Sequence, residues 1–193
     1  MEFNIIVAGT GGQGTVLASK LLCSAAMKKG LSARTSETIG MAQRGGCVTS
    51  HVRFTDDLND VSSPIIGSKS ADMIIAMELA ETVRVLPLLK EGGAVMSCNN
   101  AVFPITGSYD ADGVMAYLKK AAPDSTIADC QAFIKENGAK TLNVFLLALA
   151  AASGKLPISA NELEEAVREA FCGNQKLLEI NLKAFTAGKE AYK

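Results

Sequence analysis

Residues 4–14, Asn-Ile-Ile-Val-Ala-Gly-Thr-Gly-Gly-Gln-Gly, constrain the fold of this chain more than any other stretch. The apolar residues 5–8 have the pattern of a strand that is buried on both faces of a parallel sheet. Four glycines follow within six residues, and a segment with helical spacing begins directly behind them. Glycine is favoured where the backbone takes a positive φ or where a ligand must approach it closely. The order of strand, glycine-rich loop and helix therefore predicts the start of a Rossmann-like α/β fold.

The same loop is a candidate site for an anion. The N–H groups in the first turn of a helix have no partner within the helix, and they favour a negative charge in front of them. Gln13 adds an amide that can both donate and accept hydrogen bonds. The predicted cofactor-binding residues of this loop are Gly9, Thr10, Gly11, Gly12, Gln13 and Gly14. The alternative is a tight turn without a ligand, although four glycines exceed what such a turn needs.

Composition limits the classes of protein that this chain can belong to. A length of 193 residues suits a single domain, which we expect to span residues 1–193. The net charge of -1 and the 5% aromatic content predict neither a nucleic-acid partner nor a membrane surface. The five cysteines include no Cys-x-x-Cys pair, so we expect no metal or iron–sulfur cluster on this chain. The odd number of cysteines and the absence of a signal peptide predict a cytoplasmic protein with free thiols.

A second glycine-rich segment covers residues 38–46. Its Arg44 carries a permanent charge on a planar fork of donors, and two glycines beside it leave room for a ligand. This combination suits a carboxylate, a phosphate or an acidic group of a partner protein. The candidate residues here are Gln43, Arg44, Gly45 and Gly46. The alternative is an exposed loop whose arginine is only solvated.

Further strands are predicted at residues 31–36, 47–54, 72–77, 94–98 and 125–130. Glu37 follows the first of these, where a dinucleotide-binding fold places a ribose-binding acid. Residues 47–54 alternate between apolar and polar, which indicates an antiparallel or edge strand, and the only histidine, His51, lies on the polar side. Glu78 stands at the junction of a strand and a helix, at the same sheet edge as the first loop. It either binds a ligand hydroxyl or caps the helix.

The last third of the chain is predicted to be helical. Residues 141–153 are apolar nearly all round and indicate a buried helix, in which Asn143 needs hydrogen-bond partners. Ser159 and Glu162 have the spacing of a capping box at the start of the next helix. The whole pattern predicts a three-layer α/β/α Rossmann-like domain with a mainly parallel sheet.

These motifs resemble the γ subunit or domain of the 2-oxoacid:ferredoxin oxidoreductases, the pyruvate/ketoisovalerate oxidoreductase γ-type domain, and most of all its indolepyruvate branch. The first loop matches the glycine motif of the family, residues 43–46 its second loop, and Ser50-x-Val52-Arg53 the strand that follows. Further matches are Glu78, Glu81, Arg84, Asn143 and the final Asn181-x-x-Ala184-Phe185-x-x-Gly188. The chain departs from the pattern at Ile39, often His in this branch, and at Leu79, usually Pro.

The resemblance implies the oxidative decarboxylation of a 2-oxoacid, such as indolepyruvate or another arylpyruvate, to an aryl-acetyl-CoA. It implies a large α subunit that carries thiamine diphosphate and [4Fe-4S] clusters, coenzyme A as co-substrate, and ferredoxin as electron acceptor. The chain has no Gly-Asp-Gly thiamine motif and no cluster-type cysteine spacing, so we expect it to be inactive alone, and no catalytic residue is identified. The alternatives are a stand-alone NAD(P)-binding dehydrogenase that uses residues 9–14 and Glu37, and a non-catalytic scaffold subunit.

Overall fold

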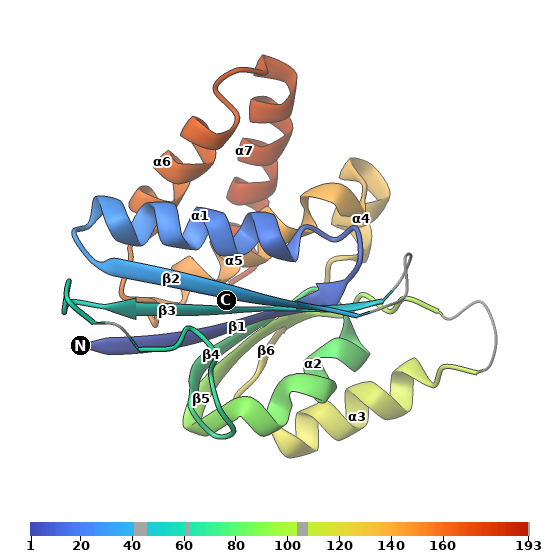
Figure 1. The fold of residues 1–193 in the computed structure, drawn as a ribbon. Coiled ribbons are helices and arrows are strands. Elements are labelled where there is room, and N and C mark those ends of the chain that lie inside the picture. Colours follow the sequence, from blue (N-terminus) through green and yellow to red (C-terminus); the bar gives the residue numbers. More distant parts are fainter. Residues whose placement is uncertain (41–45, 61, 104–107, 193) are drawn as a thin grey trace.

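A twisted six-stranded sheet forms the centre of the computed structural model, which describes residues 1–40, 46–60, 62–103 and 108–192 (Figure 1). The strands are β1 (Glu2–Thr10), β2 (Ser32–Ile39), β3 (Cys47–Thr55), β4 (Ala71–Ala76), β5 (Leu89–Cys98) and β6 (Thr126–Ala128). Their order across the sheet is β2-β3-β1-β4-β5-β6. The pairs β1–β4, β4–β5 and β5–β6 are parallel, whereas β3 is antiparallel to both of its neighbours. The sheet is therefore mixed and mostly parallel, with β1 near its centre as predicted.

Helices cover both faces of this sheet. They are α1 (Thr15–Lys28), α2 (Leu79–Val85), α3 (Ala111–Ala121), α4 (Gln131–Asn137), α5 (Leu142–Ala152), α6 (Ala160–Ala170) and α7 (Gln175–Glu190). Helices α1 and α5 lie on one face and α2 and α3 on the other, while α6 and α7 pack outside α1 and α5 (Figure 1). The predicted α/β/α layers and the helical C-terminal region are confirmed. No helix in the described part of the chain is long and apolar enough to span a membrane.

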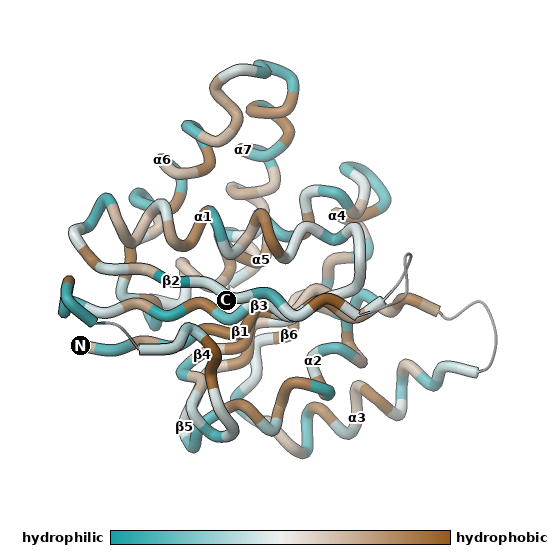
Figure 2. The backbone as a smooth tube through the Cα atoms, viewed as in Figure 1, coloured by the Kyte–Doolittle hydropathy of each residue, from teal (hydrophilic) through white to brown (hydrophobic). Residues whose placement is uncertain are grey.

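The core follows from the alternation of side chains along β1. Ile5 and Val7 pack into the cluster under α1 and α5, whereas Ile6 and Ala8 pack into the cluster on the side of α2. All four side chains have 0% exposure, as expected for a strand covered on both faces. Figure 2 shows hydrophobic residues along β1 and β4, which are the two strands at the middle of the sheet.

Two details of the strand prediction are wrong. Strand β2 continues to pair with β3 as far as Ile39, so Glu37 lies within the strand and not beyond its end. Strand β5 begins at Leu89 and not at the predicted residue 94, so Gly92 and Gly93 lie within it. Between Ala71 and Met73 the register of β4 against β5 shifts from Leu89 to Ala94, so β5 accommodates the extra residues as a bulge.

Strand β3 is antiparallel, as its alternating pattern predicts, but it lies inside the sheet between β2 and β1. Its His51 is only 7% exposed, and its Nδ1 accepts a hydrogen bond of 3.1 Å from the backbone N–H of Ile66. Burial lowers the pKa of this histidine. The side chain is thus a hydrogen-bonded part of the core and anchors the segment that precedes β4.

The C-terminal helices are fixed by close packing and by a cap. Ser159 and Glu162 form the predicted capping box: the Ser159 N–H donates to Glu162 Oε2 at 2.6 Å, and the Glu162 N–H donates to Ser159 Oγ at 3.2 Å. Helix α7 lies so close to the buried α5 that a Cβ atom on Gly188 would be 2.0 Å from the Phe145 carbonyl oxygen. Glycine is therefore required at this crossing.

Candidate functional site

The first glycine loop connects the carboxyl end of β1 to the start of α1. Gly12 has φ +95° and Gly14 has φ +80°, both in the left-handed region that glycine reaches without strain. Gly14 is the N-cap residue of α1, and no described side chain caps this helix. The first-turn N–H groups of a 14-residue helix therefore face the loop without a side-chain acceptor. Unpaired N–H groups at a helix start favour a negative charge in front of them, so the loop remains a candidate anion site.

Gln13 holds the loop in place. Its side chain is 8% exposed, its Oε1 accepts from the Thr10 N–H at 2.7 Å, and its Nε2 donates to the Met77 carbonyl at 3.4 Å. The amide therefore ties the end of β1 to the end of β4. Gly9 makes this possible, because a Cβ atom there would lie 2.6 Å from Gln13 Oε1.

A buried asparagine from the far end of the chain supports the same loop. Asn143, in the first turn of α5, is 1% exposed, and its Nδ2 donates to the Gly14 carbonyl at 3.2 Å. Its Oδ1 accepts from the Val144 N–H at 2.9 Å. A Cβ atom on Gly14 would meet Asn143 Nδ2 at 2.5 Å, so the glycine and the asparagine fit each other closely. The sequence predicts that Asn143 needs partners, and this contact supplies one.

The second glycine segment reaches the first through the backbone. The Gly11 N–H donates to the Gly46 carbonyl at 2.8 Å, and on the other side of the segment the Gly40 N–H donates to the Cys47 carbonyl at 2.8 Å. Gln43, Arg44 and Gly45 lie outside the described residues. The described ends of the segment, Gly40 and Gly46, therefore lie at the carboxyl edge of β1.

Glu78 lies at this edge as well, and its carboxylate is used within the chain. The side chain is 2% exposed and caps α2, with Oε2 accepting from the Glu81 N–H at 2.8 Å. Oε1 accepts from the Tyr109 hydroxyl at 2.8 Å and from the Val102 N–H at 3.2 Å. Burial and the hydrogen bond to Glu78 raise the pKa of Tyr109 well above its usual value. The helix-cap interpretation of Glu78 is thus realised in the structure, and a contact with a ligand hydroxyl remains a prediction.

Arg84 extends the network toward β3. Its guanidinium group pairs with Glu81 at 2.6 Å and donates to Thr49 Oγ1 at 2.7 Å. Residues 81 and 84 therefore hold α2 against β3, next to the loops. The spacing of Glu81 and Arg84 predicts that both lie on one face of a helix. It does not predict the contact with Thr49, because β3 lies far from α2 in the sequence.

The Met77 carbonyl joins several of these elements and could not be identified from the sequence. It accepts from Gln13 Nε2 at 3.4 Å and from Asn100 Nδ2 at 2.9 Å. Met77 also donates its own N–H to the Ala8 carbonyl at 2.9 Å. A backbone carbonyl is the same in every residue type, so the sequence does not reveal that this one accepts several hydrogen bonds. Only Asn99 and Asn100, directly after β5, indicate that amide donors lie nearby.

Glu37, the predicted ribose-binding acid, is exposed within β2 and accepts a weak hydrogen bond of 3.3 Å from Ser19 Oγ. The position at the end of a strand that the dehydrogenase alternative requires is therefore missing. Among the predicted residues, the structure brings together the first loop, Gly46 and the start of α2. It leaves Glu37 on the outer strand.

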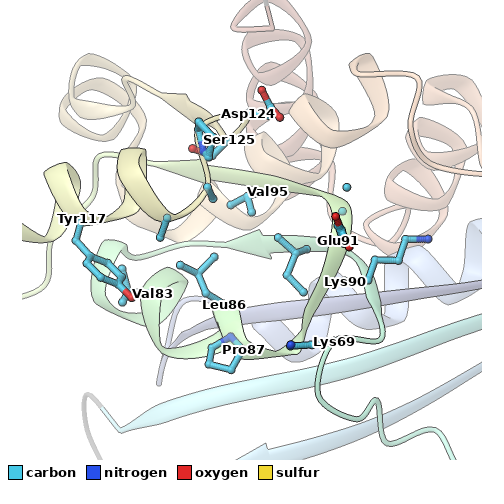
Figure 3. Close-up of a pocket in the computed structure, with 16 residues that line it drawn as sticks. Lys69, Val83, Leu86, Pro87, Lys90, Glu91, Val95, Tyr117, Asp124 and Ser125 are labelled. Carbon is cyan, nitrogen blue, oxygen red and sulfur yellow. The ribbon is translucent and has the colours of Figure 1, made fainter.

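A separate cavity of about 580 Å³ lies at the opposite edge of the sheet (Figure 3). Apolar side chains such as Val83, Leu86 and Val95 line it together with charged residues such as Lys69 and Glu91. The residues that line it come from α2 and the turn after it, from β5, and from the end of α3 and the residues that follow it. The cavity contains none of the predicted cofactor-binding residues.

The fold is that of a Rossmann-like α/β domain. At the carboxyl end of its central strand β1, a hydrogen bond between Gly11 and Gly46 joins the two glycine segments. Residues 4–191 match the family described as pyruvate ferredoxin/flavodoxin oxidoreductase, and the chain belongs to that family.

Individual proteins agree with this assignment. The chain is 33% identical to the indolepyruvate oxidoreductase subunit IorB of Archaeoglobus fulgidus, over 97% of this chain and 94% of that protein. The keto/oxoacid ferredoxin oxidoreductase γ subunit of Geobacter sulfurreducens has a similar structure, with a TM-score of 0.67, 24% identity and 98% coverage of both chains. The 2-oxoglutarate:ferredoxin oxidoreductase of Magnetococcus marinus, solved with 2-oxoglutarate, coenzyme A and succinyl-CoA, gives a TM-score of 0.71 at 22% identity. The match covers 99% of this chain and 31% of that one. The two structures establish a shared fold.

Proposed function

We propose that this chain is the small subunit of a ferredoxin-dependent indolepyruvate or arylpyruvate oxidoreductase. The complete enzyme would oxidatively decarboxylate the 2-oxoacid to an aryl-acetyl-CoA in the cytoplasm. The observation that carries the proposal is the hydrogen bond from Gly11 to Gly46, which joins the two family glycine motifs at one edge of the sheet. The family match over residues 4–191 and the similarity to an indolepyruvate oxidoreductase subunit support the same function.

The proposal assigns thiamine diphosphate and [4Fe-4S] clusters to a large partner subunit, with ferredoxin receiving the electrons. Thiamine diphosphate supplies the stabilised carbanion of the decarboxylation when it is bound there. The described residues of this chain include no group of three or more His, Cys, Asp or Glu side chains that could hold a metal ion. We assign to this chain the binding of an anionic group, either a coenzyme A phosphate or a carboxylate.

The anion would face the first turn of α1, beside Gly12. Gly12 has φ +95°, and a Cβ atom on it would meet no atom of the described residues within 4 Å. Among the described residues, none occupies the space beside Gly12 where the proposed ligand would lie. Arg44, outside the described residues, would add a planar pair of donors from the second loop.

The test introduces a charge into this space. In the reconstituted complex, Gly12→Asp should raise the KM for coenzyme A or for the 2-oxoacid by about 10- to 150-fold, since a charge-assisted contact is worth roughly 1.5–3 kcal/mol. Gly12→Asn has nearly the same shape without the charge and should have a much smaller effect. Arg44→Ala and Arg44→Lys should both weaken the same ligand, because lysine cannot replace the planar fork. Viologen reduction with indolepyruvate, phenylpyruvate and pyruvate measures the rates and the order of substrates.

Gly30→Asp provides the matched control. Gly30 follows the other end of α1 and has φ +86°, and a Cβ atom on it would also meet no described atom within 4 Å. This variant should leave both KM values unchanged. If Gly12→Asp and Gly12→Asn have equal effects, no anion is bound at this loop. If pyruvate is preferred to both aromatic substrates, the assignment to the arylpyruvate branch is wrong.

A further inference from the structure

Two cysteines that are distant in the sequence meet at the carboxyl edge of the sheet. Cys98 is the last residue of β5, and Cys130 lies two residues beyond the end of β6. The two strands are adjacent and parallel, with Cys98 paired to Ala128. Both cysteines are 0% exposed and belong to the same hydrophobic cluster, so their side chains point to the same face of the sheet.

Asn99 holds Cys130 against the end of β5. Its Oδ1 accepts from the Cys130 backbone N–H at 3.0 Å and lies 3.4 Å from Cys130 Sγ. Asn99 directly follows Cys98, and its own N–H donates to the Ala128 carbonyl at 3.0 Å. The neighbouring Cys98 thiol lowers the pKa of Cys130, whereas the Cys130 thiol and burial raise the pKa of Cys98. Of the two thiols, Cys130 therefore has the larger thiolate fraction.

Cys98 is also connected to the glycine loop. Its thiol points to the Met77 carbonyl with Sγ at 3.9 Å, and the same carbonyl accepts from Gln13 Nε2 at 3.4 Å. A change in the position of Cys98 Sγ therefore acts on an oxygen that also positions Gln13.

We propose that Cys98 and Cys130 are a redox modification site that forms a reversible intrachain disulfide when a hydroperoxide is the oxidant. The Cys130 thiolate attacks the peroxide, which breaks the O–O bond, forms a sulfenic acid and releases hydroxide. Cys98 then attacks the sulfenic sulfur, forms the S–S bond and expels the second oxygen as water after proton transfer. Both thiols are oxidised by two electrons in total, and one hydrogen peroxide is reduced to two waters. A dithiol reductant reverses the reaction.

The disulfide removes the Cys98 thiol proton from the Met77 carbonyl and moves the sulfur toward Cys130. Gln13 then loses part of its fixed surroundings, and the first glycine loop loosens. The predicted loss of activity rests on the proposed function of that loop, whereas formation of the disulfide does not.

The chemical step is tested first, on the full chain under native conditions. Hydrogen peroxide is added and removed, free thiols are alkylated, and peptides are mapped by mass spectrometry. The expected product is a Cys98–Cys130 disulfide that forms in the wild type, disappears with dithiothreitol and is absent from Cys98→Ala. The exposed Cys172 is an internal reference for ordinary surface oxidation. If Cys172 is oxidised while Cys98 and Cys130 remain free for alkylation, the proposal is overturned.

The second step uses the oxidised small subunit after assembly with an untreated large subunit, so that iron–sulfur clusters never meet the peroxide. Activity should fall relative to the reduced wild type and return with dithiothreitol. Cys130→Ala cannot form the disulfide but keeps the Cys98 thiol beside the Met77 carbonyl. This variant, checked for its melting temperature in reductant, should keep its activity after the same treatment. A mapped disulfide without any change in activity removes the link to the glycine loop. Inactive reduced enzyme contradicts the proposed function and leaves the disulfide result standing.

Discussion

Replacing Gly188 by alanine tests how closely α5 and α7 are packed. The added Cβ atom would lie 2.0 Å from the Phe145 carbonyl oxygen, 2.8 Å from the Phe145 carbonyl carbon and 3.0 Å from the Ala148 Cβ. Two of these three atoms belong to the backbone of a buried helix and cannot rotate away. The helices must therefore move apart.

The size of the effect follows from this distance. An ordinary contact begins near 3.4 Å, so the oxygen and the new methyl group must separate by roughly 1.4 Å. Overpacking of this kind costs about 3 kcal/mol. The higher helix propensity of alanine offsets about 1 kcal/mol of this cost. The expected net loss is about 2 kcal/mol in the free energy of unfolding, or roughly 4–8 °C in the melting temperature of a chain of this size.

Urea titration followed by circular dichroism measures this loss. Gly173→Ala is the control, because a Cβ atom there meets nothing within 4 Å in the described structure and its φ is not positive. That variant should unfold at the wild-type urea concentration. If Gly188→Ala does so too, or is more stable, the close crossing of α5 and α7 is wrong.

Two further variants test the buried contacts of the site. Asn143→Leu should cost about 1–3 kcal/mol in the free energy of unfolding, because the Gly14 carbonyl and the Val144 N–H lose their partner; an unchanged urea midpoint would contradict this contact. Glu78→Gln should lower the pKa of Tyr109, since the negative charge beside its hydroxyl is removed while burial still raises that pKa. An ultraviolet titration, with Tyr109→Phe to identify the signal, measures the shift, and a wild-type titration curve would refute it.

The strands are predictable from the sequence where their residues are either all apolar or strictly alternate between apolar and polar. Residues 5–8 are apolar without interruption, and the structure buries them on both sides of the sheet. The alternation in residues 47–54 predicts an antiparallel or edge strand, and β3 is antiparallel but lies inside the sheet. Glu37 was misplaced because the end of β2 is set by pairing with β3, and polar residues at a strand end give no apolar pattern to count. The bulge at Gly92 and Gly93 depends in the same way on the neighbouring β4.

The motifs of the candidate site are predictable from the sequence, but the hydrogen bonds that connect them are not. The glycine loop and the position of Glu78 follow from local sequence, and the need of Asn143 for partners follows from its apolar helix. The partners themselves do not, because Gly14 and Asn143 are 129 residues apart. The cysteines show the same limit: their spacing gives no motif, yet the parallel pairing of β5 with β6 brings Cys98 and Cys130 together.

The contact between Asn143 and Gly14 also determines when the site can mature during synthesis. The loop at residues 9–14 leaves the ribosome well before its support in α5, because 129 residues separate Gly14 from Asn143. The unit of β1, the glycine loop and α1 therefore lacks the hydrogen bond from Asn143 to the Gly14 carbonyl until α5 packs against it. A nascent chain that ends before Leu142 would carry both glycine motifs and still lack the asparagine that supports Gly14.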